Sequence, residues 1–251
     1  MIVTIVGAGR LAEGIAVRVL AGGHRLRITD IEPGKADAFV AGLAARADGP
    51  DAGASLLSVA TVAAAIAGAD VVVLALPYPE GRAVARDQGA ALSGMTVVDT
   101  CNPVDFSTFD ALLTSPGMSA AEEIADVNPG ARVVKAFNTT FVTSLIAGWV
   151  GGLPVDVFLA GDDPHAKSQV AELVRDGGMR PVDTGPLRRA RELEAFQLLH
   201  MTIQGPLGLD WASAIKLLPL RTAGTASYPA GDDRAQAAGA GVHLMGRPAD
   251  R

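Results

Sequence analysis

The sequence contains a single cysteine, Cys101, among its 251 residues. One cysteine excludes a disulfide within the chain and is typical of a reducing compartment, so we expect a cytoplasmic protein. No apolar run reaches the roughly 18 residues that a membrane-spanning helix needs. Residues 1–6 enter an apolar segment without a preceding basic stretch. We therefore expect neither a membrane span nor a signal peptide.

An excess of positive charge is also missing. The chain has 21 Lys and Arg against 27 Asp and Glu, a formal net charge of −6. Nucleic-acid binding depends on clustered Lys and Arg that neutralise phosphates, so we expect no nucleic-acid partner. With one cysteine, the widely spaced histidines offer no metal-ligand pattern, and no metal site is predicted. These are His24, His165, His200 and His243.

What the sequence does contain is a regular alternation of strand and helix signals. Residues 2–6, 70–76, 95–99 and 132–137 are largely apolar, as expected for strands buried on both faces. Leu11, Ile15 and Val19 recur at helical spacing between the first of these runs and a further strand expected at residues 25–30. This alternation predicts an α/β fold with a doubly wound parallel sheet. Helix N-caps are predicted at Thr61, at Ser119 with Glu122, and at Asp163 before Pro164.

A glycine motif follows the first predicted strand. Residues 7–12 read Gly-Ala-Gly-Arg-Leu-Ala, which is the G-x-G-x-x-A fingerprint between a strand and a helix. Gly7 permits the tight turn, Gly9 leaves no side chain where a pyrophosphate approaches the backbone, and Ala12 permits close helix–strand packing. The free N–H groups at the helix N-terminus favour phosphate binding. The pattern predicts a Rossmann dinucleotide-binding fold.

Acidic residues follow the second predicted strand. Asp30 lies about 20 residues after the glycines, where an acidic side chain binds the ribose hydroxyls of NAD. Together with Glu32 it would repel a 2′-phosphate, which favours NAD(H) over NADP(H). A basic side chain that reaches the phosphate would reverse this preference, and the candidates are Arg10, Arg25, Arg27 and Lys35.

Further candidate site residues follow the later strands, because ligands of open α/β sheets bind at the carboxyl ends of the strands. They are Leu76, Pro77 and Tyr78, then Asn102 and Pro103, then Asn138 and Thr139. Apolar and aromatic atoms suit the faces of a nicotinamide ring, and amide and hydroxyl groups suit its carboxamide. The alternative for each is a loop side chain that bonds its own backbone.

The pattern changes near residue 151, and we predict a division of the chain there. Residues 1–150 are the predicted dinucleotide-binding domain. Residues 151–219 are predicted to form a smaller C-terminal α/β segment that completes the active-site cleft, with a strand at 154–160, a long helix at 188–204 and a last helix at 211–218. Residues 220–251 are rich in Gly, Ala, Asp and Arg and are predicted to be a mobile tail.

Several segments resemble the F420-dependent NADP oxidoreductases, a family of NADPH-dependent reductases of the deazaflavin coenzyme F420. They are GAGRLAEGIAVRVLAGGH, VVVLALPYPEG, SAAEEIADVNPGARVVKAFNTTF, VFLAGDD and MRPVDTGPLRRARELEAF. The last two are the most characteristic, because a GDD strand end and a DxGPL turn before a long helix are not general Rossmann features. The resemblance covers roughly residues 1 to 218.

The resemblance implies direct hydride transfer between nicotinamide and deazaflavin, a small-molecule redox partner, and a homodimer. No catalytic side chain is predicted, since such a transfer needs no nucleophile. The implied dinucleotide contacts fall on Gly7, Gly9, Arg10, Leu11, Asp30, Leu76, Pro77, Tyr78, Asn102 and Pro103, and Asn138 and Thr139 correspond to residues lining the nicotinamide and deazaflavin. This chain departs from the family after the second strand, where Asp30-Ile31-Glu32 replace a Ser or Thr followed by Arg.

Two other functions fit the same dinucleotide-binding half. An NAD(P)-dependent reductase of a small imine, ketone or hydroxy acid would need a proton donor, for which Lys135, Tyr78 and His200 are the candidates. A non-catalytic dinucleotide-binding protein would need none. Neither a Tyr-x-x-x-Lys pair nor a G-x-S-x-G elbow is present.

Some single residues have a simpler structural interpretation. Cys101 is predicted to be a small packing residue, and His200 a buried histidine on the apolar face of a helix. Lys135 lies within a predicted strand and is either a basic partner or part of a solvent-facing edge. Trp149 and Trp211 are predicted to be core or interface residues.

Overall fold

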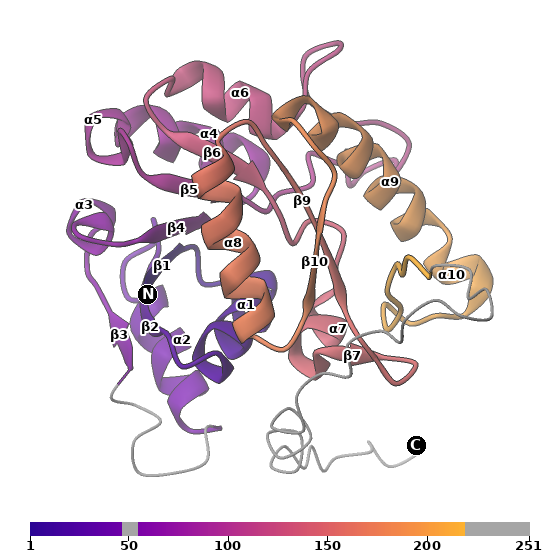
Figure 1. The fold of residues 1–251 in the computed structure, drawn as a ribbon, viewed down its shortest axis with the longest axis horizontal. Coiled ribbons are helices and arrows are strands. Elements are labelled where there is room, and N and C mark those ends of the chain that lie inside the picture. Colours follow the sequence, from indigo (N-terminus) through magenta and orange to yellow (C-terminus); the bar gives the residue numbers. More distant parts are fainter. Residues whose placement is uncertain (47–54, 219–251) are drawn as a thin grey trace, which may run out of the picture. The chain divides into compact units, whose positions relative to one another are not determined.

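The structure, a computed structural model, describes residues 1–46 and 55–218 (Figure 1). The predicted tail, residues 220–251, lies outside this part of the chain. Residues Met1–Leu217 form one compact unit. Its strands are β1 (Ile2–Val6), β2 (Arg25–Thr29), β3 (Leu56–Ser58), β4 (Val71–Leu74), β5 (Thr96–Asp99), β6 (Arg132–Lys135), β7 (Trp149–Val150), β8 (Leu153–Pro154), β9 (Asp156–Gly161) and β10 (Arg180–Asp183).

Helices follow most of these strands. They are α1 (Arg10–Ala21), α2 (Lys35–Ala44), α3 (Val62–Ile66), α4 (Tyr78–Asp87), α5 (Gly89–Leu92), α6 (Ala120–Val127), α7 (Val142–Ala147), α8 (Pro164–Asp176), the 3₁₀ turn η1 (Leu187–Arg189), α9 (Ala190–Thr202) and α10 (Gln204–Leu207). The predicted caps are confirmed. Thr61 accepts from the third residue of α3, Ser119 and Glu122 form a capping box on α6, and Asp163 caps α8 with Pro164 in its first turn.

One sheet of the described residues contains eight strands in the order β3-β2-β1-β4-β5-β6-β9-β10. Neighbours from β3 to β6 are parallel, β9 is antiparallel to β6, and β10 is parallel to β9. The predicted doubly wound α/β fold is confirmed. The strand order reverses between β1 and β4, and open sheets of this kind bind ligands at that switch point.

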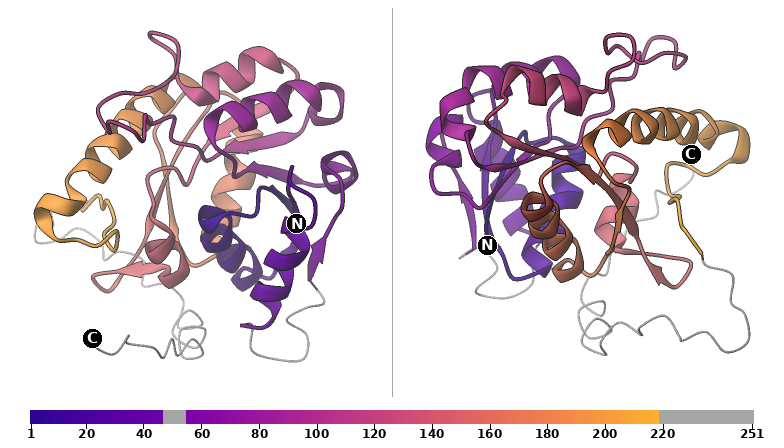
Figure 2. Two further views of the ribbon diagram at one scale, coloured as in Figure 1. Left: turned by 180° about the vertical axis from the view of Figure 1, so that it is seen from behind. Right: turned by 45° about the horizontal axis from the view of Figure 1, so that its top comes forward.

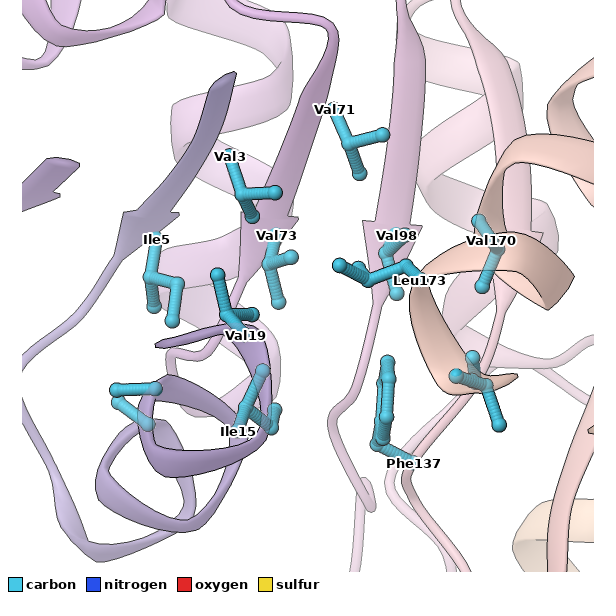
Figure 3. Close-up of a cluster of buried hydrophobic side chains, with 14 of the residues drawn as sticks. Val3, Ile5, Ile15, Val19, Val71, Val73, Val98, Phe137, Val170 and Leu173 are labelled. Atoms are coloured by element: carbon cyan, nitrogen blue, oxygen red, sulfur yellow. The ribbon is translucent and has the colours of Figure 1, made fainter. Parts of the chain in front are cut away.

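Helices cover both faces of the sheet. Val73 belongs to one apolar cluster with Ile15 of α1 and Leu173 of α8 (Figure 3), and Val72 belongs to the opposite cluster with Ile124 of α6. Successive strand residues point to opposite faces, so a strand covered on both sides must be apolar throughout. This double burial explains the apolar runs in the sequence.

The C-terminal segment extends the same sheet through β9 and β10. Whether residues 151–219 act as a domain of their own stays a prediction. The long helix predicted at 188–204 is divided into η1, α9 and α10, and Pro206 lies in the first turn of α10, where no intrahelical N–H is required.

The prediction of a helix at residues 211–218 is wrong. This stretch consists of turns and irregular backbone, with one isolated bridge from Ala214 to Thr140. Asp210 and Trp211 have φ of 47° and 58°, in the left-handed region that an α-helix cannot contain. Lys216 then donates to the buried Asp156, so tertiary contacts override the local helical pattern.

Candidate functional site

The glycine loop lies at the switch point of the sheet. Gly7 has φ of +115°, and an added Cβ would lie 2.3 Å from the carbonyl oxygen of Ala75 after β4. Its N–H donates to the carbonyl of Thr29 at 2.8 Å. Only glycine has this conformation at low cost and this small a volume. Gly7 therefore allows the ends of β1, β2 and β4 to meet.

Gly9 has the opposite surroundings. It is the N-cap of α1, and within the described part of the chain no side-chain cap bonds to the first N–H groups of that helix. An added Cβ at Gly9 would meet nothing within 4 Å. Arg10 beside it is exposed and Leu11 is half-buried. A pyrophosphate fits this arrangement, because unpaired N–H groups and the partial positive charge of a helix N-terminus both attract phosphate.

Asp30 directly follows β2 and lies beside the glycine loop, and its carboxylate is already engaged. One oxygen accepts from the Ala8 N–H at 2.7 Å and the other from the Glu32 N–H at 2.9 Å. The side chain is 1% exposed, and the Lys35 ammonium lies 3.7 Å away. A carboxylate can accept about four hydrogen bonds, so capacity for ribose hydroxyls remains. Contact between Asp30 and a ribose stays a prediction.

The structure separates the four basic candidates for a 2′-phosphate. Arg27 donates to the carbonyls of Ala65 and Ala67. Arg25 begins β2 and so lies at the amino end of a strand whose carboxyl end carries the site. Lys35 pairs with Glu32 at 2.9 Å. Arg10 and Lys35 are the two candidates on the side of Asp30.

Tyr78 begins α4 after a three-residue connection from the end of β4 at Leu74, and Pro77 is the N-cap of that helix. The Tyr78 hydroxyl donates to the carboxylate of Glu123, which also accepts from the Ser115 N–H at 2.8 Å. Burial, together with the Glu123 hydrogen bond, raises the pKa of Tyr78 to about 12. Leu76, before Pro77, is buried. Sequence reasoning missed Glu123.

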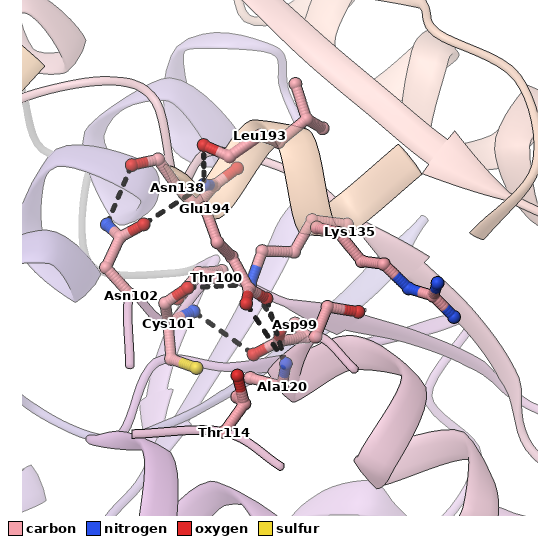
Figure 4. Close-up of polar contacts among 12 residues, drawn as sticks. Asp99, Thr100, Cys101, Asn102, Thr114, Ala120, Lys135, Asn138, Leu193 and Glu194 are labelled. Carbon is pink, nitrogen blue, oxygen red and sulfur yellow. Dashed lines mark hydrogen bonds and ion pairs between the residues drawn. The ribbon is translucent and has the colours of Figure 1, made fainter. Parts of the chain in front are cut away.

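Asn102 and Asn138 are brought together from the ends of β5 and β6 (Figure 4). The Asn102 amide donates to the Asn138 carbonyl at 2.8 Å, and the Asn138 amide donates to Asn102 Oδ1 at 3.0 Å and to the Leu193 carbonyl at 3.2 Å. Phe137, just before Asn138, has φ of 64°. Such a conformation in a bulky residue costs energy and is frequent at functional sites.

Two polar side-chain atoms after the end of β6 have no hydrogen-bond partner among the described residues: Asn138 Oδ1 and Thr139 Oγ1. Both side chains belong to residues that are 1% exposed. A buried polar atom without a hydrogen bond is costly and requires an explanation, such as a ligand. The carboxamide of a nicotinamide, which both donates and accepts hydrogen bonds, fits this pair.

Lys135 is not at a solvent-facing edge but is fully buried at the end of β6. Its ammonium donates to Asp99 Oδ2 at 2.6 Å, to the Cys101 carbonyl at 2.7 Å and to Glu194 Oε1 at 2.7 Å (Figure 4). Burial alone lowers the pKa of Lys135, but the two carboxylates outweigh it and raise that pKa above its ordinary value. Burial raises the pKa of Glu194, and Lys135 opposes that shift.

The other interpreted residues lie nearby. Cys101 is a buried residue, and burial raises the pKa of its thiol. His200 is 6% exposed, with Nε2 2.9 Å from Ser213 Oγ and Nδ1 3.2 Å from Gln197 Oε1. Burial lowers the pKa of His200. Trp149 is 37% exposed and Trp211 is 44% exposed, so neither is a core residue. An interface role for them stays a prediction.

Two negative findings concern residues 1–46 and 55–218. They contain no group of three or more His, Cys, Asp or Glu side chains arranged to hold a metal ion. Over the same ranges, no helix combines the length and apolar character needed to span a bilayer.

Comparison with known proteins identifies related chains. Residues 2–103 match the family model "NADP oxidoreductase coenzyme F420-dependent". The F420-dependent NADP reductase of Methanothermobacter marburgensis is 29% identical over 203 residues, which are 78% of this chain and 89% of that protein. A solved structure from Arthrobacter sp. FB24, provisionally named an F420-dependent NADP reductase, superposes with a TM-score of 0.66 at 27% identity and covers 82% of this chain and 94% of its own.

A longer relative matches the same region. The metalloreductase STEAP3 of Rattus norvegicus is 30% identical over 196 residues, or 78% of this chain. This chain therefore spans only 36% of the length of that protein.

Proposed function

This chain belongs to the coenzyme F420-dependent NADP oxidoreductase family, and from this premise we propose that it transfers a hydride between a nicotinamide dinucleotide and a deazaflavin of the F420 type. When bound, the nicotinamide donates or accepts the hydride at its C4 carbon. The observation that carries the proposal is the pairing of an open helix N-terminus at Gly9 with unpartnered Asn138 and Thr139 atoms.

Each part of the dinucleotide has a candidate partner in this chain. The α1 N–H groups above Gly9, flanked by Arg10 and Leu11, would bind the pyrophosphate. Asp30 would accept from the adenosine ribose. Asn138 Oδ1 and Thr139 Oγ1 would bind the carboxamide, with Leu76, Pro77, Tyr78, Asn102 and Pro103 around the ring. The chain's own contribution is to bind, orient and exclude water.

All three candidate proton donors are already hydrogen-bonded within the protein. This supports a deazaflavin ring as the hydride acceptor over an imine, ketone or hydroxy acid. Lys135 is saturated by three acceptors, the Tyr78 hydroxyl donates to Glu123, and His200 contacts Ser213 and Gln197. Reduction of a ketone or imine needs a proton at the reacting centre. A conjugated deazaflavin ring delocalises the added electron pair away from the carbon that receives the hydride, so the proton that completes the reduction can come from water at a ring nitrogen without a donor at the reacting carbon.

For the cofactor, we propose NAD(H). Asp30 and Glu32 put two carboxylates where the 2′-phosphate of NADP(H) would lie, and Lys35 is occupied by Glu32. The family description names NADP.

The direct test mixes purified protein with NADH or NADPH and an oxidised deazaflavin and follows the deazaflavin absorbance. We expect bleaching that depends on both protein and nucleotide. Binding of a nucleotide without bleaching would contradict the deazaflavin assignment. It would favour a small imine, ketone or hydroxy acid as substrate, or a non-catalytic dinucleotide-binding protein.

We also propose a homodimer in the cytoplasm. Helix α9 buries Glu194, Gln197 and His200 and leaves apolar residues exposed at helical spacing, namely Phe196 at 42% and Leu199 at 56%, followed by Leu207 of α10 at 63%. Both views of Figure 2 show α9 and α10 at the outer edge of the described fold. A twofold axis needs only one such stripe, because the same patch serves both copies.

A further inference from the structure

The buried Lys135 side chain holds several segments of the chain together. An ammonium has three N–H donors, and here the three go to Asp99, Cys101 and Glu194. These acceptors come from the end of β5, the loop after it, and α9, while Lys135 itself ends β6. One fully buried group therefore joins four segments of the chain.

The two carboxylates around Lys135 have further fixed contacts. Asp99 Oδ1 accepts from the Cys101 N–H at 3.1 Å. The Glu194 carboxylate accepts from the Ala120 N–H, at the start of α6, at 3.1 Å. Removing one member of a buried charged cluster leaves the others without compensation. Loss of one member would therefore leave a buried charge without its partner.

Three of the segments held by the cluster lead to the amide pair. Cys101 immediately precedes Asn102, and Lys135 lies three residues before Asn138. Glu194 immediately follows Leu193, whose carbonyl accepts from Asn138. A movement of any of these segments would change the acceptors that surround the Asn138 amide.

The orientation of the Asn138 amide is fixed by its neighbours. Backbone carbonyls can only accept, so the Asn138 carbonyl requires the amide nitrogen of Asn102, and the Leu193 carbonyl requires that of Asn138. Both N–H groups of the Asn138 side chain are then used, and its buried Oδ1 has no partner among residues 1–46 and 55–218.

We propose that Lys135 and Glu194 are positioning residues that hold Asn138 Oδ1 toward the nicotinamide half of the dinucleotide. This rests on the proposed function only in that a nicotinamide is bound; it does not depend on the second substrate. Neither side chain touches the ligand. Glu194 acts through the Leu193 carbonyl, and Lys135 acts through the Cys101 carbonyl and Glu194.

The test compares two ligands that share the adenosine half. NADH carries the nicotinamide and ADP-ribose does not. The dissociation constant for ADP-ribose divided by that for NADH therefore isolates the nicotinamide contribution, and a lower ratio means a weaker preference for NADH. General destabilisation of the protein weakens both affinities alike and leaves the ratio unchanged. We expect Glu194→Gln, in which an amide must face donors, to reduce the preference for NADH about tenfold, as expected for loss of one buried hydrogen bond. Asn138→Ala should do the same.

A matched control and a second variant complete the design. Glu192→Gln makes the same change on the exposed side of α9, at a residue that pairs with Arg189, and should leave the ratio at the wild-type value. Glu194→Asp keeps the charge but shortens the side chain by one methylene, and should also lower the ratio if Glu194→Gln does not fold.

The outcomes separate this proposal from the function. A wild-type ratio in folded Glu194→Gln or Glu194→Asp, with a reduced ratio in Asn138→Ala, would overturn the positioning role alone. A wild-type ratio in Asn138→Ala would overturn the assignment of Asn138 to the nicotinamide, and the positioning role with it. Deazaflavin bleaching is scored separately, so a failure of the acceptor assignment does not affect this ratio.

Discussion

The Asp30 carboxylate has a structural role in the glycine loop, in addition to any contact with a ligand. Its two carboxylate oxygens hold the N–H groups of Ala8 and Glu32, and this fixes the glycine loop against the end of β2. A negative charge held there also sets the electrostatic condition for the adenosine ribose. It tolerates hydroxyl groups, which donate, and repels a phosphate, which only accepts.

We therefore predict that Asp30→Ser shifts the cofactor preference toward NADPH. The ratio of the dissociation constants for NADH and NADPH, measured by fluorescence of the reduced nucleotide, should change about tenfold, or about 1.4 kcal/mol. Asp37→Ser is the matched control, because Asp37 is an exposed residue of α2 that pairs with Ser58. An unchanged preference in Asp30→Ser would show that Asp30 does not face the ribose.

Single residues were the hardest features to predict. The sequence indicated that Asn102 and Asn138 follow neighbouring strands, but not that they bond one another. Lys135 could be placed in a strand without revealing whether it faced solvent. Its partner Glu194 is 59 residues away in the sequence, on a helix whose packing no local pattern specifies. A lysine inside an apolar strand was the one available signal of a buried anion.

At the scale of elements, the sequence was informative where burial imposes a pattern. The strands of the sheet interior are apolar on both faces, and β1, β4, β5 and β6 were predicted from that property. β3 was missed, because an edge strand of three residues leaves no comparable run. The caps at Thr61, Ser119 and Asp163 were predicted because a local side chain satisfies the helix N–H groups.

The stretch after α10 was predicted wrongly for a related reason. Residues 209–218 are fixed by long-range contacts, such as Thr143 donating to the Trp211 carbonyl and Ser144 to the Ser213 carbonyl. Helix α9 departs from the usual rule, since its buried face includes the polar residues Glu194, Gln197 and His200, while Phe196 and Leu199 are exposed. Apolar periodicity alone identified the helix but could not tell which face is covered.

At the scale of the whole molecule, the exposed stripe of α9 and α10 leads to a prediction about assembly. Leu199→Glu would put a charge in the centre of a shared interface and should convert the dimer to a monomer in sedimentation velocity. Leu57→Glu is the control, because Leu57 is similarly exposed, at 58%, but lies on β3. It should leave the sedimentation coefficient unchanged. A wild-type protein that sediments as a monomer at micromolar concentration would contradict the homodimer.

The proposed function depends on dinucleotide binding at the α1 N-terminus through the open space at Gly9. We would measure the affinity for NADH and NADPH by isothermal titration calorimetry on wild type and Gly9→Val. Apart from its chain neighbours, a Cβ at Gly9 meets no atom of residues 1–46 and 55–218 within 4 Å. The variant should therefore keep its melting temperature while affinity falls by about 100-fold or more, because the added side chain fills the phosphate position. Uptake of neither nucleotide by folded wild type, or equal affinity in Gly9→Val, would contradict the account.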